Sequence, residues 1–162
     1  MRHCKIIGLL SLVLAGSSNA SSERSNVDWI TQFNMDTQTR EATLDWVLQR
    51  DECITQEKES KELFPRNEWF DSLPKQDKIK VVLYINNAKL QACSEQESRQ
   101  LERLVDEGNH EKLKETLTAL GAFDWPDESQ LEGVDRDEVE QLSEQVGMFN
   151  TRLVGEQLKF RE

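Results

Sequence analysis

Histidine and cysteine are scarce in this chain, and their scarcity excludes several kinds of catalytic site. The 162 residues include two histidines, His3 and His110, and three cysteines. A zinc site needs several such ligands, and a Ser-His-Asp arrangement would have to use His110 with a serine that has no nucleophile-elbow motif around it. The sequence also holds no C-x-x-C, no phosphate-binding P-loop and no dinucleotide-binding fingerprint. We therefore predict that the protein is not an enzyme and binds no metal or cofactor.

Basic residues are too few to balance the acidic ones. Lys and Arg number 20 against 31 Asp and Glu, which gives a formal net charge of −11. Nucleic-acid binding depends on Lys and Arg that neutralise phosphates, so this composition excludes it. A surface of this sign favours a basic protein partner.

A single long apolar run is present, at residues 6–15. It follows Arg2 and Lys5 and precedes a small, polar stretch in which Ser18 and Ala20 occupy the −3 and −1 positions of a cleavage site. This three-part order is typical of a secretory signal peptide. The run is shorter than the roughly 20 residues that span a bilayer, so we predict no stable membrane insertion after cleavage. Residues 1–20 are thus predicted to be a signal peptide and the mature protein to be periplasmic or secreted; an uncleaved amphipathic anchor is the alternative.

Two cysteines, Cys53 and Cys93, remain after that cleavage, because Cys4 lies in the signal segment. An oxidising compartment converts such a pair into a disulfide where the geometry allows it. The loop it closes spans 40 residue steps, for which chain entropy predicts a stabilisation of about 4 kcal/mol. We predict a structural disulfide between these residues.

The apolar spacing of residues 21–162 predicts one all-α domain, a compact bundle of five or six helices with one inter-helix disulfide. Asp36 or Thr37 is expected to cap a long helix that ends at Phe64-Pro65 and carries the stripe Leu44, Val47, Leu48, Ile54. Trp46 lies off this stripe.

A second helix is expected from Pro74 to Cys93, with the stripe Ile79, Val82, Leu83, Asn86, Leu90. Residues 81–85 alone would also fit a buried strand. The aromatic connector of residues 66–73 should pack on the core and let the second helix cross the first at an angle, as the disulfide requires.

Further helices follow from cap signals. Ser94 and Glu97 predict a capping box for a helix that stops at Gly108. Asn109 is expected to cap the next helix and Gly121 to end it in a left-handed conformation. A final helix is expected from Asp135, with the heptad-like seam Val139, Leu142, Val146, Phe149, Leu153. The seam is short, which favours a bundle helix over a coiled-coil dimer. Gly147 lowers the stability of this helix relative to alanine.

The loop before that final helix holds the candidate partner-binding residues. Trp125 offers an apolar anchor among acidic side chains, namely Asp124, Asp127, Glu128 and Glu132. Tryptophans also fill cores, so both roles stay open for the four in this chain. An EF-hand is excluded because Val139 falls where the bidentate glutamate must stand, whereas looser calcium binding stays open.

We therefore predict an exported acidic helical interaction protein, of the inhibitor or immunity-factor type, that binds a basic partner protein. Two alternatives are a periplasmic chaperone or stress module with an apolar concave face, and a carboxylate-dependent hydrolase of envelope glycans.

Overall fold

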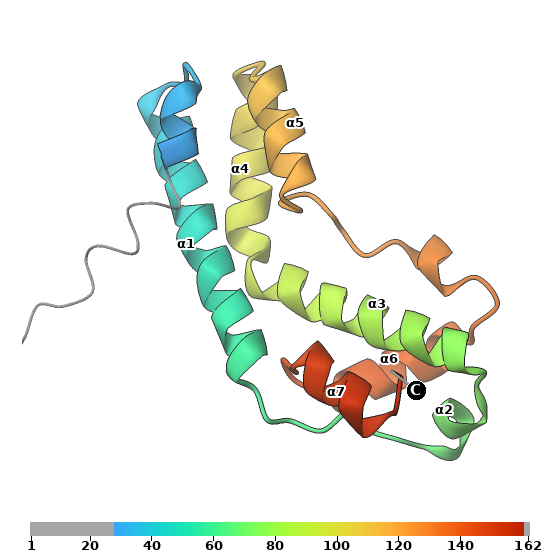
Figure 1. Cartoon of the computed structure of the whole chain (residues 1–162). Coiled ribbons are helices and arrows are strands. Elements are labelled where there is room, and N and C mark those ends of the chain that lie inside the picture. The colour runs from blue at the N-terminus through green and yellow to red at the C-terminus, as the bar shows by residue number, and fades with distance from the viewer. Residues whose placement is uncertain (1–27, 161–162) are drawn as a thin grey trace, which may run out of the picture.

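The computed structural model describes residues 28–160, which form seven α-helices and two short 3-10 helices with no strand in that range (Figure 1). The elements in chain order are η2 (Asp28–Gln32), α1 (Thr37–Glu59), α2 (Glu68–Ser72), α3 (Lys75–Cys93), α4 (Glu95–Glu107), α5 (Glu111–Ala119), η3 (Glu128–Leu131), α6 (Arg136–Glu144) and α7 (Thr151–Gln157). The all-α prediction is confirmed, with more helices than the five or six expected. The predicted signal peptide, residues 1–20, lies outside the described range.

One group of helices consists of η2, α1, α4 and α5, and α1, α4 and α5 run side by side in the upper part of the molecule (Figure 1). Their apolar faces enclose what we call the first core cluster. Its buried members are Ile30, Met35, Ala42, Trp46, Leu101, Leu104, Val105, Leu113, Leu117 and Ala122. Trp46 is thus a core residue, because the face of α1 that meets α4 is not the stripe expected from the sequence.

The other group surrounds the first half of α3 and contains α2, η3, α6 and α7. We call its interior the second core cluster. Its buried members are Phe64, Phe70, Val81, Val82, Ile85, Leu131, Val134, Val139, Leu142, Val146, Phe149 and Val154. The ring centroid of Phe64 lies 5.2 Å from that of Phe70 and 5.3 Å from that of Phe149. The connector of residues 66–73 therefore packs on the core, as predicted.

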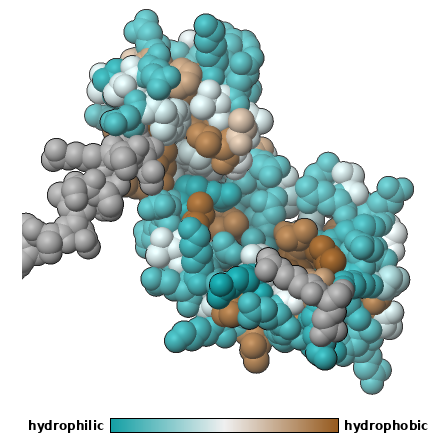
Figure 2. Space-filling view, in the orientation of Figure 1, coloured by the Kyte–Doolittle hydropathy of each residue, from teal (hydrophilic) through white to brown (hydrophobic). Residues whose placement is uncertain are grey.

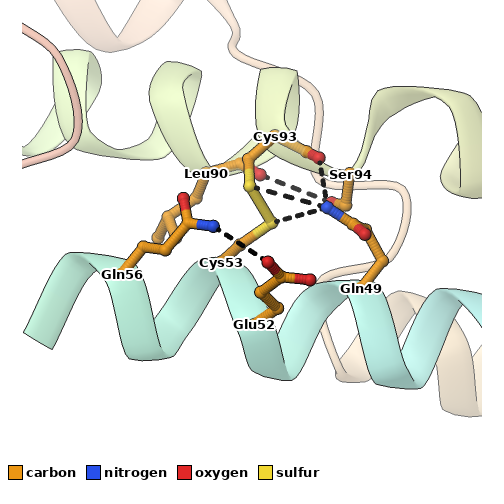
Figure 3. The surroundings of a disulfide bond; sticks show 7 residues. All are labelled: Gln49, Glu52, Cys53, Gln56, Leu90, Cys93 and Ser94. Atoms are coloured by element: carbon orange, nitrogen blue, oxygen red, sulfur yellow. Dashed lines mark hydrogen bonds between the residues drawn. A yellow bond between two sulfur atoms is a disulfide. The ribbon is translucent and has the colours of Figure 1, made fainter. Parts of the chain in front are cut away.

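The Cys53–Cys93 disulfide joins the two groups. It links α1 to the last residue of α3, with the two Cα atoms 6.0 Å apart and Cys53 fully buried. Around it, Gln49 Nε2 donates to the carbonyl oxygen of Cys93 at 3.0 Å (Figure 3). Figure 1 shows α3 crossing α1 at a steep angle, so both the pairing and the angled crossing predicted from the sequence are confirmed.

The start of α1 was predicted correctly and its end was not. Asp36 is the N-cap, and its carboxylate accepts a hydrogen bond from the Thr39 amide at 2.9 Å. The helix stops at Glu59, before the predicted end at Phe64-Pro65. An extended segment follows because Phe64 must reach the second core cluster, where its amide and carbonyl bond to the side chain of Gln157 at 3.0 and 3.1 Å.

Residues 81–85 are helical, so the strand alternative is wrong. The predicted stripe on α3 holds for Val82, whereas Leu83 is 56% exposed. Gln91, which the sequence did not mark, is buried and donates to the Gly121 carbonyl at 2.9 Å. The predicted capping box is also wrong: the Ser94 hydroxyl donates back to the Leu90 carbonyl at 3.3 Å, because Ser94 alone separates α3 from α4.

The two ends of α5 differ in how well the sequence predicted them. Gly121 has a φ of +78°, the left-handed conformation expected after this helix. Asn109 is not the cap of α5. It takes a left-handed φ of +52°, and His110 occupies the N-cap position without a side-chain bond.

The predicted final helix is divided in two. α6 ends at Glu144 and α7 begins at Thr151. The Asn150 side chain caps α7 by accepting from the amides of Arg152 and Leu153, and the Gly147 amide donates to Glu62 Oε1 at 3.0 Å. Val139 and Leu142 on α6 are buried, as are Val146 and Phe149 in the link that follows. The seam therefore marked core residues correctly, but the prediction that one continuous helix carries them is wrong.

Candidate functional site

The candidate partner-binding residues lie in the link between α5 and α6, here called the acidic loop (residues 124–132). Side chains of α3 hold both of its ends. Asn87 Nδ2 donates to the Asp124 carbonyl at 3.4 Å, and Lys80 Nζ donates to the Glu132 carbonyl at 3.3 Å. These two contacts hold the loop, with its five candidate residues, against α3.

The carboxylates of this loop have different surroundings, although all four are exposed. Asp127 caps η3 and accepts from the Ser129 amide and hydroxyl, each at 2.8 Å, and these bonds lower the pKa of its carboxyl. Glu128 forms an ion pair with Arg136. Within residues 28–160, Asp124 and Glu132 form no ion pair closer than 4.0 Å, although Asp124 is near enough to Arg50 to act on its charge.

Trp125 is half-buried, and one face of its ring is covered. The Arg99 guanidinium lies 4.5 Å from the ring centroid, a cation–π contact, and the same guanidinium pairs with Glu95 at 2.7 Å. The residue therefore links the acidic loop to α4, and only part of its surface is open to a partner.

A second feature, a groove along α1, was not identified from the sequence. It encloses about 500 Å³, within the range of small-molecule pockets. Its lining combines a mostly apolar wall with a few charged residues: Trp29, Trp46, Val47, Leu48, Arg50, Asp51, Glu52, Ile54, Thr55 and Leu120. Leu48 and Leu120 are 58% and 50% exposed and share this groove, on a surface that is mainly hydrophilic in the view of Figure 2.

Two residues of the groove carry buried donors that lack acceptors. Among the residues that the structure describes, no acceptor bonds Trp46 Nε1, Arg50 Nε or Arg50 Nη1. Burial lowers the pKa of Arg50, and the nearby charges of Asp124 and Glu57 raise it in part. This pair was not predicted, because Trp46 lies off the stripe expected on this helix and Arg50 belongs to no motif.

His110 contacts the start of α1. Its Nε2 lies 3.5 Å from Asp36 Oδ2, and its side chain is 19% exposed, less than expected for a first-turn residue. Hydrogen bonds from Thr39, with a smaller contribution from His110, lower the pKa of Asp36 to about 2. These contacts tie the α4–α5 link to α1, which is a structural role.

No three His, Cys, Asp or Glu side chains within residues 28–160 are grouped so that they could hold a metal ion. No helix in the same range is long and apolar enough to cross a membrane.

The fold and these surfaces define a class, an all-α helical bundle with one inter-helix disulfide. No protein-family model, curated protein or solved structure matches the chain. Its function must therefore be argued from its own surfaces.

Proposed function

We propose that this protein is an exported, non-enzymatic interaction protein that binds a basic partner protein through the acidic loop. The observation that supports the proposal most is the composition of that loop: four exposed carboxylates share it with Trp125, and Glu128 alone of them forms an ion pair. The overall charge of −11 has the same sign.

The anchoring of the loop favours tight rather than adaptable binding. Because Asn87 and Lys80 hold its two ends and Asp127 caps η3, little chain entropy is lost when a partner docks. Opposite charges on the partner would speed association and set its orientation, and such binding weakens as salt screens the charges. A partner with Lys or Arg side chains around an apolar contact for Trp125 fits this surface.

Charge reversal tests the proposal. We expect the variant Asp124→Lys/Glu132→Lys to lose most of its binding to a basic protein that the wild type captures from a cell-envelope extract at low salt. Both side chains are exposed and unpaired within the described range, so the fold should persist; circular dichroism and the thermal midpoint check that. The readout is the captured protein, identified by mass spectrometry, and its affinity by titration at two salt concentrations.

The matched control is Glu111→Lys/Glu115→Lys, which makes the same charge change on exposed positions of α5. It should keep most of the binding. Equal losses in both double variants would show an effect of net charge alone, and capture of no protein at low salt would contradict the proposal. An aggregation assay with unfolded clients and a peptidoglycan turnover assay test the chaperone and hydrolase alternatives, which stay predictions.

A further inference from the structure

We propose that the groove along α1 is a binding site for a small apolar carboxylate of the medium-chain fatty-acid type. The inference does not rest on the function proposed above, although Asp124 of the acidic loop lies near enough to Arg50 to act on its charge. Three observations carry it: the apolar wall of the groove, its dimensions, and the buried donors of Trp46 and Arg50.

The wall of the groove favours an alkyl chain. Residues of η2, α1 and the end of α5 form it, and two of them, Leu48 and Leu120, expose half or more of their side chains. Along α1 the lining runs from Trp46 to Thr55, which corresponds to about 14 Å at 1.5 Å per residue. A chain of ten to twelve carbons, on the order of that length, would cover this surface and remove it from water.

The donors favour a carboxylate as the polar end of the ligand. Arg50 and Trp46 stand one helical turn apart on α1, and three of their buried nitrogens have no acceptor within the described residues. Unpaired buried donors are costly, and a charged one more so. A planar carboxylate is the ligand group that best matches a guanidinium. The guanidinium lies close to the turn that follows α5. Its Nη2 is 3.8 Å from the point where a Cβ on Gly121 would stand.

The acidic groups around the groove limit the ligand to a single negative charge. Asp51 and Glu52 line it, and Asp124 and Glu57 act on Arg50 from outside. None of these four carboxylates comes within 4.0 Å of the guanidinium, so the position next to Arg50 remains available. Salt screens the repulsion from these groups as well as the attraction to Arg50, so the affinity for an anionic ligand should change little with ionic strength. Binding of a basic protein to the acidic loop should instead weaken as salt rises.

Titration of the purified full chain with dodecanoate, below its micelle concentration, tests the site. We expect saturable binding by calorimetry, together with a change in tryptophan fluorescence, because Trp29 and Trp46 line the groove. Dodecanol and dodecylammonium, with the same chain and no carboxylate, should bind at least tenfold more weakly, as expected for loss of a charge-assisted hydrogen bond.

The decisive variant is Arg50→Gln, which should weaken dodecanoate binding about tenfold or more. Its matched control, Arg40→Gln, removes an exposed cation of the same helix that does not line the groove and should bind as the wild type does. Arg50 is partly buried, and two of its guanidinium nitrogens have no acceptor within the described residues, so its replacement should leave the thermal midpoint unchanged or raise it. Lost binding would then not reflect unfolding.

The proposal would be overturned by no saturable binding, by equal affinity for dodecanol, or by equal loss in both arginine variants. Tighter binding of an apolar peptide with a free C-terminal carboxylate than of dodecanoate would assign the groove to a protein terminus and also overturn it. So would a dimer in sedimentation that takes up no dodecanoate, since a second copy would then fill the groove.

Discussion

At the scale of single residues, Asp36 connects the start of the longest helix to the rest of the first group. Its carboxylate accepts from the Thr39 amide at 2.9 Å and the Thr39 hydroxyl at 2.6 Å, and His110 approaches it from the link between α4 and α5. These bonds favour the ionised form and lower the pKa of Asp36 to about 2. One exposed carboxylate thereby serves both as a helix cap and as a contact between two helices.

We expect Asp36→Ala to lower the thermal midpoint by a few degrees at neutral pH, because α1 loses its side-chain cap. The pKa of Asp36 is lower in the folded state than its ordinary 3.8, so its charge stabilises the fold above that value. This contribution is lost as the pH falls towards about 2, where the variant and the wild type should converge. Asp45→Ala, an exposed aspartate of the same helix, is the control. A midpoint difference that does not change between pH 6 and pH 2 would contradict this role.

At the scale of elements, the break between α6 and α7 depends on the end of α1. Asn150 caps α7 and also donates from Nδ2 to the Lys58 carbonyl at 2.7 Å. Glu57 Oε1 accepts from the Thr151 amide and hydroxyl, and Glu62 Oε1 accepts from the Gly147 amide. Hydrogen bonds to Glu57, Lys58 and Glu62 therefore dock this link on residues that are far away in the sequence.

The variant Asn150→Ala should destabilise the protein by about 1–2 kcal/mol, because it removes the cap and the bond to Lys58 together. Hydrogen exchange measured by mass spectrometry should speed up in α7 more than in α4. Asn34→Ala, at an exposed position before α1, is a suitable control and should change neither quantity. Uniform acceleration in all helices would show that Asn150 has no local role.

The same contacts explain which elements the sequence could predict. Asp36 and Gly121 act within a few residues of their own helix, and their residue types indicate those roles directly. Asn150, Ser94 and Asn109 are also cap-type residues, but their conformations depend on distant partners or on the close junction of two helices. The helix expected from the seam of Val139 to Leu153 is broken at a link whose amides donate to Glu57 and Glu62. Such contacts with a distant segment leave no pattern in the seam itself.

The candidate sites follow the same rule. The acidic loop is continuous in the sequence, so its residues could be named in advance, although the Arg99 contact with Trp125 could not. The groove brings together η2, α1 and Leu120, and its donors lack partners only because of how these segments pack. A binding site assembled from separate elements has no signal in one helix.

At the scale of the whole molecule, the disulfide is a covalent cross-link between the two groups of helices in addition to the backbone. Cys53 belongs to α1, whose buried residues lie mainly in the first core cluster, and Cys93 ends α3, which fills the second. Closing a loop of 40 residues stabilises the fold by about 4 kcal/mol in the chain-entropy model. That is a large share of the stability of a small protein, so reduction of the disulfide should destabilise the fold.

The mass of the protein isolated from its native source, measured before and after reduction and alkylation, tests this account most directly. We expect a chain that begins at Ser21, with no thiol modified at Cys53 or Cys93 until a reductant is added. A chain that still begins at Met1, or free thiols at these two positions in the untreated protein, would contradict both the predicted export and the oxidised link between the two groups.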